Sequence, residues 1–552
     1  MKPRDKIEAE VFEAWKTLNP SEAFGGGLKE YASRVFIPKP KDVQNILKHV
    51  SKLKTQAKDP CEKALLATIS RRMALGEPEI FPEDVLGAFF AHMIKEGVNK
   101  EHLRKLADES MKELSAALEY TDKNWAPGVK ILTLIRCYGL LEILETAEKE
   151  AKDPTLTKKI AALRKLTLKY AQHFNITGFD YNATFEQTYA LLKKGCDLGR
   201  EKIYAQALRD LYDYEETPRE VEAAGLNMLE SEFPALQRIV KLLAKEFNCE
   251  ANAETLAKAI HQKHGLKQKQ IIPFIMEVRK SAQALCNKHL VGINPHYETQ
   301  VLETPSYLTG VFPSGGAFFF DFLTAKPFQV FIATTDPHRS PHTVPAEILN
   351  LLVHEEYGHC VHGSNSSYAY GAKPTLTESL TSLMGNAISE GISFQREKEF
   401  MDLLDEIAEM KKPGKEEKAF IDFCKKYGGF KSMRNEYEFY TRMWRIVRFL
   451  RVIGDARINS GKQNIVEFVE WAHKKTGLSK ALVYFQVFPA HQGNGPGYAS
   501  TYAIIGERIR AIQEKAKKNG VSLRDLNTYA CSMGYPPKRI FEKRLLTYAK
   551  AA

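Results

Sequence analysis

The stretch that decides how this chain is interpreted is LLVHEEYGHCVH, from Leu351 to His362. It places three histidines and two adjacent glutamates within one apolar, helix-length run. The mostly apolar segment Ile348–Val353 leads into the cluster and argues against a surface helix. Burying several imidazoles and carboxylates without partners would be costly. The stretch therefore predicts a metal site rather than a chance group of surface histidines.

The spacing of the first two histidines is unusual, because His354 and His359 are five residues apart. The H-E-x-x-H zinc motif has its histidines four apart, on one helix face. In an α-helix, positions four apart differ by about 40° around the axis, whereas positions five apart differ by about 140°. A π-bulge would return both to one face, and Gly358 lies where a backbone distortion costs least. We expect the helix to be overwound out of α geometry here, with both histidines pointing at one metal.

The residue types in the cluster suit a hydrolytic zinc site. Zinc binds imidazole and carboxylate, and a catalytic site has three protein ligands and leaves one position for water, whose pKa falls to about 7. Glu355 is the expected general base, and Glu356 is the alternative candidate. His362 is expected to support the site or the fold, because a fourth protein ligand would close it.

A third ligand must come from farther along the chain. Glu378 lies 19 residues after His359 and Glu390 lies 31 residues after it. Both fall in the helix-like segment TESLTSLMGNAISEGISFQRE, so the residues alone leave the two alternatives open.

Around the cluster, the sequence predicts a mostly α-helical chain with one small sheet. Two β-prone runs, Ala317–Phe322 and Phe328–Thr334, predict an antiparallel hairpin at about 317–334. An extended peptide could add to its edge as a further strand. Pro345 fits the first turn of the metal helix and Gly363 fits its end. Residues 1–286 are predicted to form an N-terminal helical lobe, and residues 287–552 a second lobe that carries the metal site.

Composition limits the classes of partner. The net charge of +11 comes from 79 basic and 68 acidic residues, which is mild for 552 residues and does not suggest nucleic-acid binding. The eight cysteines are far apart, as in a reduced cytoplasmic protein. No signal peptide or membrane span is expected. The oligomeric state is left open, with a homodimer among the alternatives.

Four arginines three residues apart, Arg442, Arg445, Arg448 and Arg451, predict a cationic helix stripe. The stripe could bind the C-terminal carboxylate of a peptide, or its members could be solvated or paired within the fold.

Four segments together resemble a known group of proteins. HEEYGH is similar to the H-E-x-x-G-H motif of dipeptidyl peptidase III. The order of AFFFDF with PFQVFIATTDP, then HEEYGHCVH, SEGISFQRE and GPGYASTYAIIG resembles the domain-of-unknown-function family 885 and the helical gluzincins, namely the thimet oligopeptidase and carboxypeptidase Taq families. The resemblance covers residues 305–550. It departs at the metal motif, which is one residue shorter, and at Ile392, where the family has tryptophan.

The resemblance implies a zinc metallopeptidase with one Zn²⁺ per chain, in a deep cleft that admits short peptides. It makes His354, His359 and Glu390 the zinc ligands and Glu355 the general base. Further implied residues are Glu397, which would orient a ligand, Tyr498 and Tyr502, which would bind the oxyanion, and His491, which would contact the substrate. Of the two tyrosines, Tyr502 is the preferred oxyanion donor. Two alternatives stay open: an inactive helical scaffold with a relic metal site, and a zinc hydrolase of a non-peptide amide.

Overall fold

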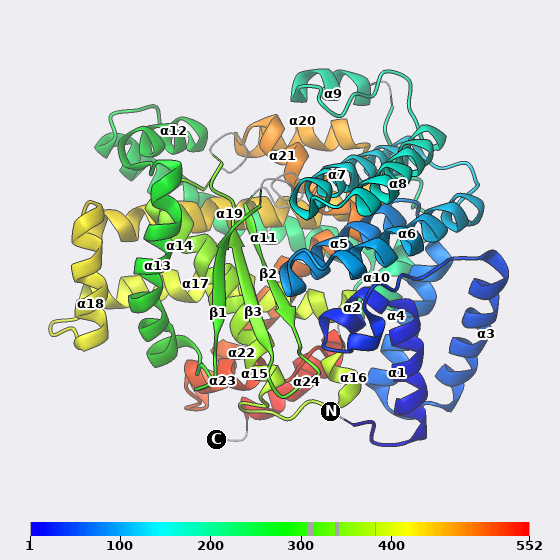
Figure 1. Ribbon diagram of the computed structural model, residues 1–552. Coiled ribbons are helices and arrows are strands. Elements are labelled where there is room, and N and C mark those ends of the chain that lie inside the picture. Colours follow the sequence, from blue (N-terminus) through cyan, green and yellow to red (C-terminus); the bar gives the residue numbers. More distant parts are fainter. Residues whose placement is uncertain (1, 194, 306–313, 337–341, 381, 551–552) are drawn as a thin grey trace.

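The computed structural model describes residues 2–193, 195–305, 314–336, 342–380 and 382–550. It is mostly helical with one small sheet, which confirms the predicted fold class (Figure 1). The helices before the sheet are α1 (Lys6–Leu18), α2 (Pro20–Gly25), α3 (Pro40–Gln56), α4 (Pro60–Leu75), α5 (Ile80–Glu96), α6 (Lys100–Tyr120), α7 (Pro127–Ala151), α8 (Pro154–His173), α9 (Phe185–Leu192), α10 (Tyr204–Tyr212), α11 (Pro218–Glu246), α12 (Ala253–His264) and α13 (Gln268–Leu285). Those after it are α14 (Pro345–Leu352), α15 (Val361–Ser367), α16 (Leu376–Ser379), α17 (Leu383–Glu409), α18 (Lys415–Cys424), α19 (Phe430–Asn459), α20 (Ile465–Thr476), α21 (Lys480–Val487), α22 (Tyr498–Lys518), α23 (Leu523–Ala530) and α24 (Lys538–Tyr548).

The sheet contains the predicted hairpin and one strand that was not predicted. Strands β2 (Gly315–Phe320) and β3 (Phe328–Ala333) pair antiparallel, with Phe318 opposite Val330. Strand β1 (Thr299–Glu303) pairs parallel to β3, which gives the order β1-β3-β2. The sequence of β1, TQVLE, is largely polar and none of its residues is buried, so it lacks the apolar pattern of a strand.

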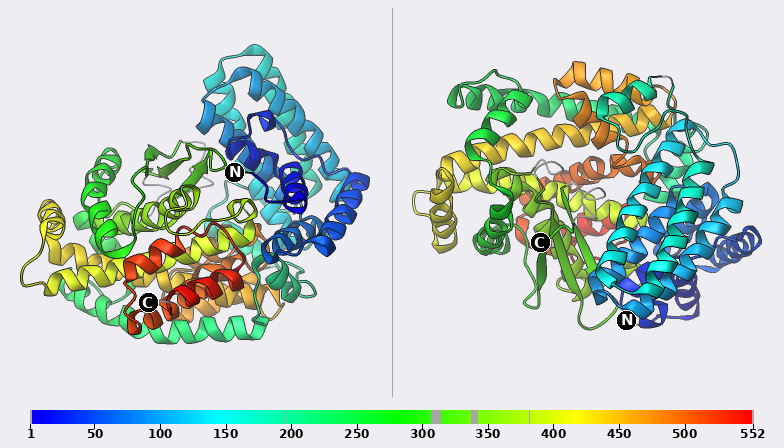
Figure 2. Two further views of the ribbon diagram at one scale, coloured as in Figure 1. Left: turned by 90° about the horizontal axis from the view of Figure 1, so that it is seen from below. Right: turned by 45° about the horizontal axis from the view of Figure 1, so that its top comes forward.

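The sheet lies between two groups of helices. The N-terminal helices α1–α8 gather on the β2 side, and α13 lies beside β1 (Figures 1 and 2). On the β2 side the rings of Phe90 and Phe318 have centroids 4.5 Å apart. The helix that carries the histidine cluster packs against β2 and β3. The sheet therefore contacts both the N-terminal helices and the helix that carries the cluster.

The helix that carries the histidine cluster begins where the sequence predicts but ends later. Pro345 occupies its first turn, as expected. The predicted end at Gly363 is wrong, because the helix continues to Ser367. A Cβ on Gly363 would lie 2.4 Å from a ring carbon of Phe319. Glycine is therefore needed here so that strand β2 can approach the helix, rather than to terminate it.

The hydrophobic core does not follow the order of the chain strictly. One large cluster combines buried residues from Val129 to Ala549, and α11 packs along α19 within it. A second cluster joins the N-terminal helices to three residues of the sheet, Phe320, Val330 and Ile332.

The predicted division into lobes at residue 286 stays a prediction. Among the described residues, no helix is both long and apolar enough to cross a membrane.

Candidate metal centre

The two spaced histidines lie on a π-helical segment, Val353–Cys360, between α14 and α15. Hydrogen bonds of the i to i+5 type widen each turn, so residues five apart come to lie on one face. The imidazole centroids of His354 and His359 are accordingly 4.9 Å apart. The predicted departure from α geometry is confirmed. Its predicted sense is wrong, because a π-helix is wound more loosely than an α-helix, not overwound.

Gly358 permits close helix packing at this segment. A Cβ at this position would lie 2.2 Å from Oγ of Ser393 and 2.7 Å from its Cα. Because one of these atoms belongs to the backbone, a side-chain rotation could not relieve the clash. The glycine therefore brings the π segment directly against α17, the helix that carries Glu390.

His354, His359 and Glu390 meet at one point. One ligand atom from each lies within 4.8 Å of the other two. Nε2 of His354 and Nε2 of His359 lie 3.5 and 3.3 Å from the same Oε2 of Glu390. That oxygen is buried and accepts no hydrogen bond from any residue that the structure describes. Two imidazole nitrogens and one carboxylate oxygen are a donor set that fits a zinc ion with one further position for water.

Glu378, the alternative third ligand, lies elsewhere. It is on the short helix α16, where its carboxylate is 2.6 Å from the guanidinium of Arg544 and accepts a hydrogen bond from Sγ of Cys61. Of the two candidate carboxylates, the fold brings only Glu390 to the histidines.

The second ring nitrogen of each imidazole, Nδ1, also has a polar partner. Nδ1 of His354 is 2.6 Å from Oε1 of Glu397, and Nη2 of Arg448 donates to the same oxygen at 2.6 Å. Nδ1 of His359 is 2.8 Å from Oγ of Ser389. Such outer partners fix the ring orientation and direct Nε2 toward the centre.

The charge state of the triad follows from these contacts. Burial alone would lower the pKa of His354, but the nearby carboxylates of Glu390 and Glu397 raise it to about 9. Burial would raise the pKa of Glu390, yet the positive charge of His359 and the proximity of both imidazoles hold it well below its usual range. Glu390 is thus ionised, and its negative charge stabilises positive charge beside it.

Arg448 and Ser389 are functional partners that the sequence did not reveal. Ser389 directly precedes Glu390, and that adjacency was the one available signal. Arg448 belongs to the predicted stripe on α19, but nothing in the sequence pairs it with Glu397.

His362 supports the fold, as expected, and does not join the triad. Its Nε2 is 2.9 Å from the carbonyl oxygen of Gly534, and its Nδ1 is 3.2 Å from Oγ of Ser389. Burial lowers its pKa to about 4, so the ring is neutral near pH 7.

The adjacent glutamates have different surroundings. Glu356 is fully buried and accepts two hydrogen bonds of 2.7 Å from Nε and Nη2 of Arg279 and one of 3.2 Å from Tyr297. Glu355 is partly exposed, and its carboxylate makes no hydrogen bond with the described residues. Of the two carboxylates, that of Glu356 is therefore committed to an ion pair, whereas that of Glu355 is not.

Two tyrosines and a histidine complete the site. The hydroxyl of Tyr498 donates to Oε1 of Glu390 at 2.8 Å, and the hydroxyl of Tyr502 lies 3.4 Å from the hydroxyl of Tyr498. The ring of Tyr502 is nearly parallel to that of His354, with centroids 6.4 Å apart. The ring of His491 lies 5.5 Å from Tyr502 and 6.2 Å from Tyr498. The first turns of α22 and the preceding loop thus place all three candidates beside the triad.

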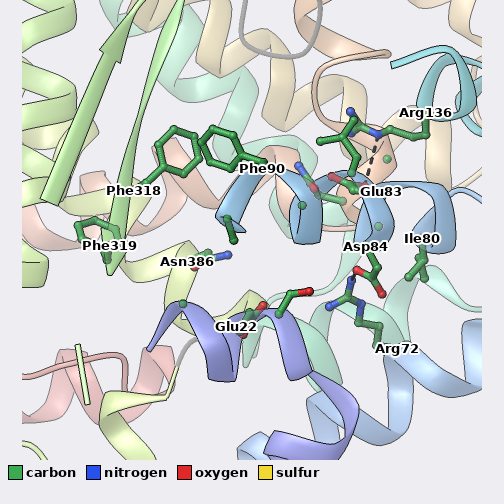
Figure 3. Close-up of a pocket in the computed structure, with 18 of the residues that line it drawn as sticks. Glu22, Arg72, Ile80, Glu83, Asp84, Phe90, Arg136, Phe318, Phe319 and Asn386 are labelled. Atoms are coloured by element: carbon green, nitrogen blue, oxygen red, sulfur yellow. Dashed lines mark hydrogen bonds and ion pairs between the residues drawn. The ribbon is translucent and has the colours of Figure 1, made fainter. Parts of the chain in front are cut away.

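A cavity of about 400 Å³ adjoins these elements (Figure 3). Phe90 and Phe318 form part of one wall, and the opposite side carries two ion pairs, Glu83 with Arg136 at 3.3 Å and Asp84 with Arg72 at 3.1 Å. The remaining boundary includes Asn386, one helical turn before Glu390, and Gly493–Gly495, just after His491.

Comparisons with known proteins show the fold alone. No family profile matches the chain, and no curated protein matches it. A solved structure described as a "putative lipoprotein of unknown function" from Shewanella oneidensis is similar over 98% of this chain and 99% of its own, with a TM-score of 0.67 and 16% identity. A "putative lipoprotein" from Colwellia psychrerythraea is similar over 99% of both chains, with a TM-score of 0.64 and 12% identity. Two whole-length structures thus share this architecture.

Proposed function

We propose that this chain is a zinc-dependent metallopeptidase that hydrolyses short peptides. The observation that supports this best is the convergence of His354, His359 and Glu390 within 4.8 Å. At that point lies a buried oxygen of Glu390 that accepts no hydrogen bond within the described part of the chain. A carboxylate with that environment is explained by a cation that replaces the missing donors.

The residues around the triad have the roles that peptide hydrolysis needs. Zinc at this position would supply a Lewis acid that activates water and polarises the peptide carbonyl. Glu355 accepts the proton of the attacking water and passes it to the leaving amine. Tyr502 donates a hydrogen bond to the carbonyl oxygen as negative charge develops there. Tyr498 orients Glu390 through its 2.8 Å hydrogen bond.

The surroundings favour a peptide over other amides. Strand β2 is at one edge of the sheet and lines the cavity with Phe318, Phe319 and Phe320. An extended peptide can add its main-chain hydrogen bonds to such an edge and place alternate side chains in the adjoining space.

The test combines metal content with turnover. The purified protein should contain one zinc per chain by mass spectrometry, and His359→Ala should lose it. A mixed library of short peptides should be cleaved by the unchanged protein, whereas Glu355→Gln should keep its zinc and lose at least about 99% of kcat, since general-base catalysis contributes about 10²–10⁴-fold. Glu409→Gln, on the exposed end of α17, is the control. Zinc without hydrolysis of any library member would contradict the proposal and favour an inactive scaffold.

We also propose a cytoplasmic location, supported by the eight cysteines, all of which are free. Reduced, mostly buried thiols are typical of reducing compartments. Cell fractionation with detection of the untagged protein tests this.

A further inference from the structure

The loop before α22 carries His491 and leads directly into Tyr498. It covers residues 491–497, and glycine occupies three of these seven positions. Gly495 and Gly497 have φ angles of 91° and 103°, which other residues rarely adopt. Because glycine loses the most conformational freedom on folding, contacts from elsewhere in the fold are needed to hold this loop in one conformation.

Arg200, in the segment before α10, supplies such contacts. Its Nη1 donates to the backbone oxygen of Gln492 at 3.1 Å and to Oε1 of the same residue at 3.3 Å. Its Nε and Nη2 donate to the two carboxylate oxygens of Glu77 at 2.6 and 2.7 Å, and Nη2 also donates to Glu79 at 3.3 Å. One buried guanidinium thus joins the turn between α4 and α5 to the residue that follows His491.

Further hydrogen bonds connect Gln492 to the start of α22. Nδ2 of Asn459 donates to Oε1 of Gln492 at 3.1 Å and to Oδ1 of Asp455 at 2.8 Å. The same Oδ1 accepts a hydrogen bond of 3.1 Å from the backbone N–H of Gly497. Gly497 is the N-cap residue of α22, where the helix dipole favours a nearby carboxylate. The network that holds the loop therefore also holds the first turn of α22, which carries Tyr498.

Helix α10 contacts the loop at a second point. The hydroxyl of Tyr212 donates to the backbone oxygen of Asn494 at 2.9 Å. Glu77 and Gly493–Gly495 line the cavity that adjoins the site, so Arg200 joins two parts of its wall. The loop is thus held at Gln492 and at Asn494 by residues from the N-terminal half of the chain.

We infer that Arg200 is a positioning residue for hydrolysis, because it fixes the loop 491–497 and thereby sets where the hydroxyls of Tyr498 and Tyr502 lie. The inference rests on the proposed function and adds a residue that does not touch the metal ligands. Tyr498 donates to Glu390 at 2.8 Å, and Tyr502 follows one helical turn later, so a shift of this turn moves both hydroxyls. A misplacement of about 1 Å can lower turnover about 100-fold.

The experiment separates positioning from stability by comparing Arg200→Met with Arg457→Met. Arg457 pairs with Glu222 at 2.6 Å and joins α11 to α19 away from the loop, so its loss should lower Tm alone. In Arg200→Met, amide hydrogen exchange of residues 491–502 should become at least about tenfold faster, because a buried ion pair is broken. The zinc content should stay at one per chain.

Turnover and analogue binding measure the consequence for catalysis. In Arg200→Met, kcat should fall about 10–100-fold while KM stays within about threefold. Affinity for a phosphinic tetrapeptide, which mimics the tetrahedral intermediate, should fall by the same factor as kcat. Arg200→Lys should regain part of the stability, since an ammonium still pairs with Glu77. It should not regain kcat, because it lacks the fork that binds Glu77 and Gln492 together.

Loop exchange and kcat in Arg200→Met that match those of Arg457→Met would overturn the inference, as would full recovery of kcat in Arg200→Lys. If Arg200→Met does not fold, Tyr212→Phe decides. It removes one hydroxyl and should speed loop exchange and lower kcat about 2–10-fold, and no change in either would overturn the inference.

The same data distinguish this inference from the proposed function. Faster loop exchange in Arg200→Met, with no hydrolysis by the unchanged protein, would uphold the positioning of the loop and defeat the proposed function. Hydrolysis by the unchanged protein, with loop exchange and kcat unaffected by Arg200→Met, would do the reverse.

Discussion

Nδ1 of His354 lies 2.6 Å from Oε1 of Glu397, seven residues beyond Glu390 on the same helix. Two successive turns of α17 therefore supply both the carboxylate at the centre and the one behind the first imidazole. Burial would raise the pKa of Glu397, but the charge of Arg448 and the hydrogen bond to His354 keep it below its usual range. The ionised form is thus the one that holds the ring.

Removing this outer carboxylate should weaken metal binding. Glu397→Ala leaves His354 free to rotate and Arg448 without its partner, so we expect zinc affinity to fall about 10–100-fold. Competition with a chromophoric chelator measures the change. Glu409→Ala, at the exposed end of the same helix, should have no effect. Unchanged affinity in Glu397→Ala would show that the hydrogen bond does not orient the ligand.

Adding one methyl group at Gly358 should separate the metal helix from α17. The new Cβ would meet the backbone of Ser393 at 2.7 Å, so Gly358→Ala should cost about 1–3 kcal/mol of unfolding free energy and weaken zinc binding. Thermal unfolding and zinc content measure both effects. A Cβ on Gly87, within α5, would meet nothing within 4 Å outside its own helix, so Gly87→Ala should be neutral or stabilising by about 0.5–1 kcal/mol. Equal effects at both positions would contradict the packing argument.

The elements that the sequence predicted are those with a local pattern. The hairpin at 317–334 has two β-prone runs, and the metal helix has a proline at its start. Strand β1 could not be found, because its pairing depends on β3 and its own residues are exposed. The five-residue spacing of the histidines indicated a non-α turn, since only such a turn places both on one face.

The candidate site was predictable only in part, because its second half is assembled by tertiary packing. Glu378 and Glu390 were equivalent in sequence, and the chain separates them by starting a new helix at residue 383. Nothing local indicates that Arg448 would reach Glu397, since 51 residues separate them. Similarly, the sequence could not show that Arg451 would be the one arginine of its stripe with no carboxylate of the described residues within ion-pair distance.

The two adjacent glutamates should respond differently to the same change. Glu356→Gln weakens the buried ion pair with Arg279, so stability should fall, by up to about 3–5 kcal/mol if the guanidinium is left uncompensated. Zinc content and kcat should stay within a few-fold, whereas Glu355→Gln should lose turnover and keep stability. Chemical denaturation and a peptide assay on both variants test this. Loss of turnover in Glu356→Gln, at full zinc content and in folded protein, would make Glu356 the base instead.

Asp455 should make stability depend on pH between about 4 and 6. Its buried carboxylate accepts hydrogen bonds from Tyr204, Asn459 and the backbone N–H of Gly497, which precedes Tyr498. Burial raises its pKa from 3.8 to about 6, so the folded chain binds this proton more tightly than the unfolded chain. The stability that protonation contributes is complete below pH 4 and is lost as pH rises through 6, at a cost of about 3 kcal/mol. The side chain of Asp455→Asn is neutral at every pH. The Tm of this variant minus the Tm of the unchanged protein should therefore increase as pH rises from about 4 to 6, and should stay constant above that. Parallel Tm curves for Asp455→Asn and the unchanged protein would mean that this carboxyl group ionises normally.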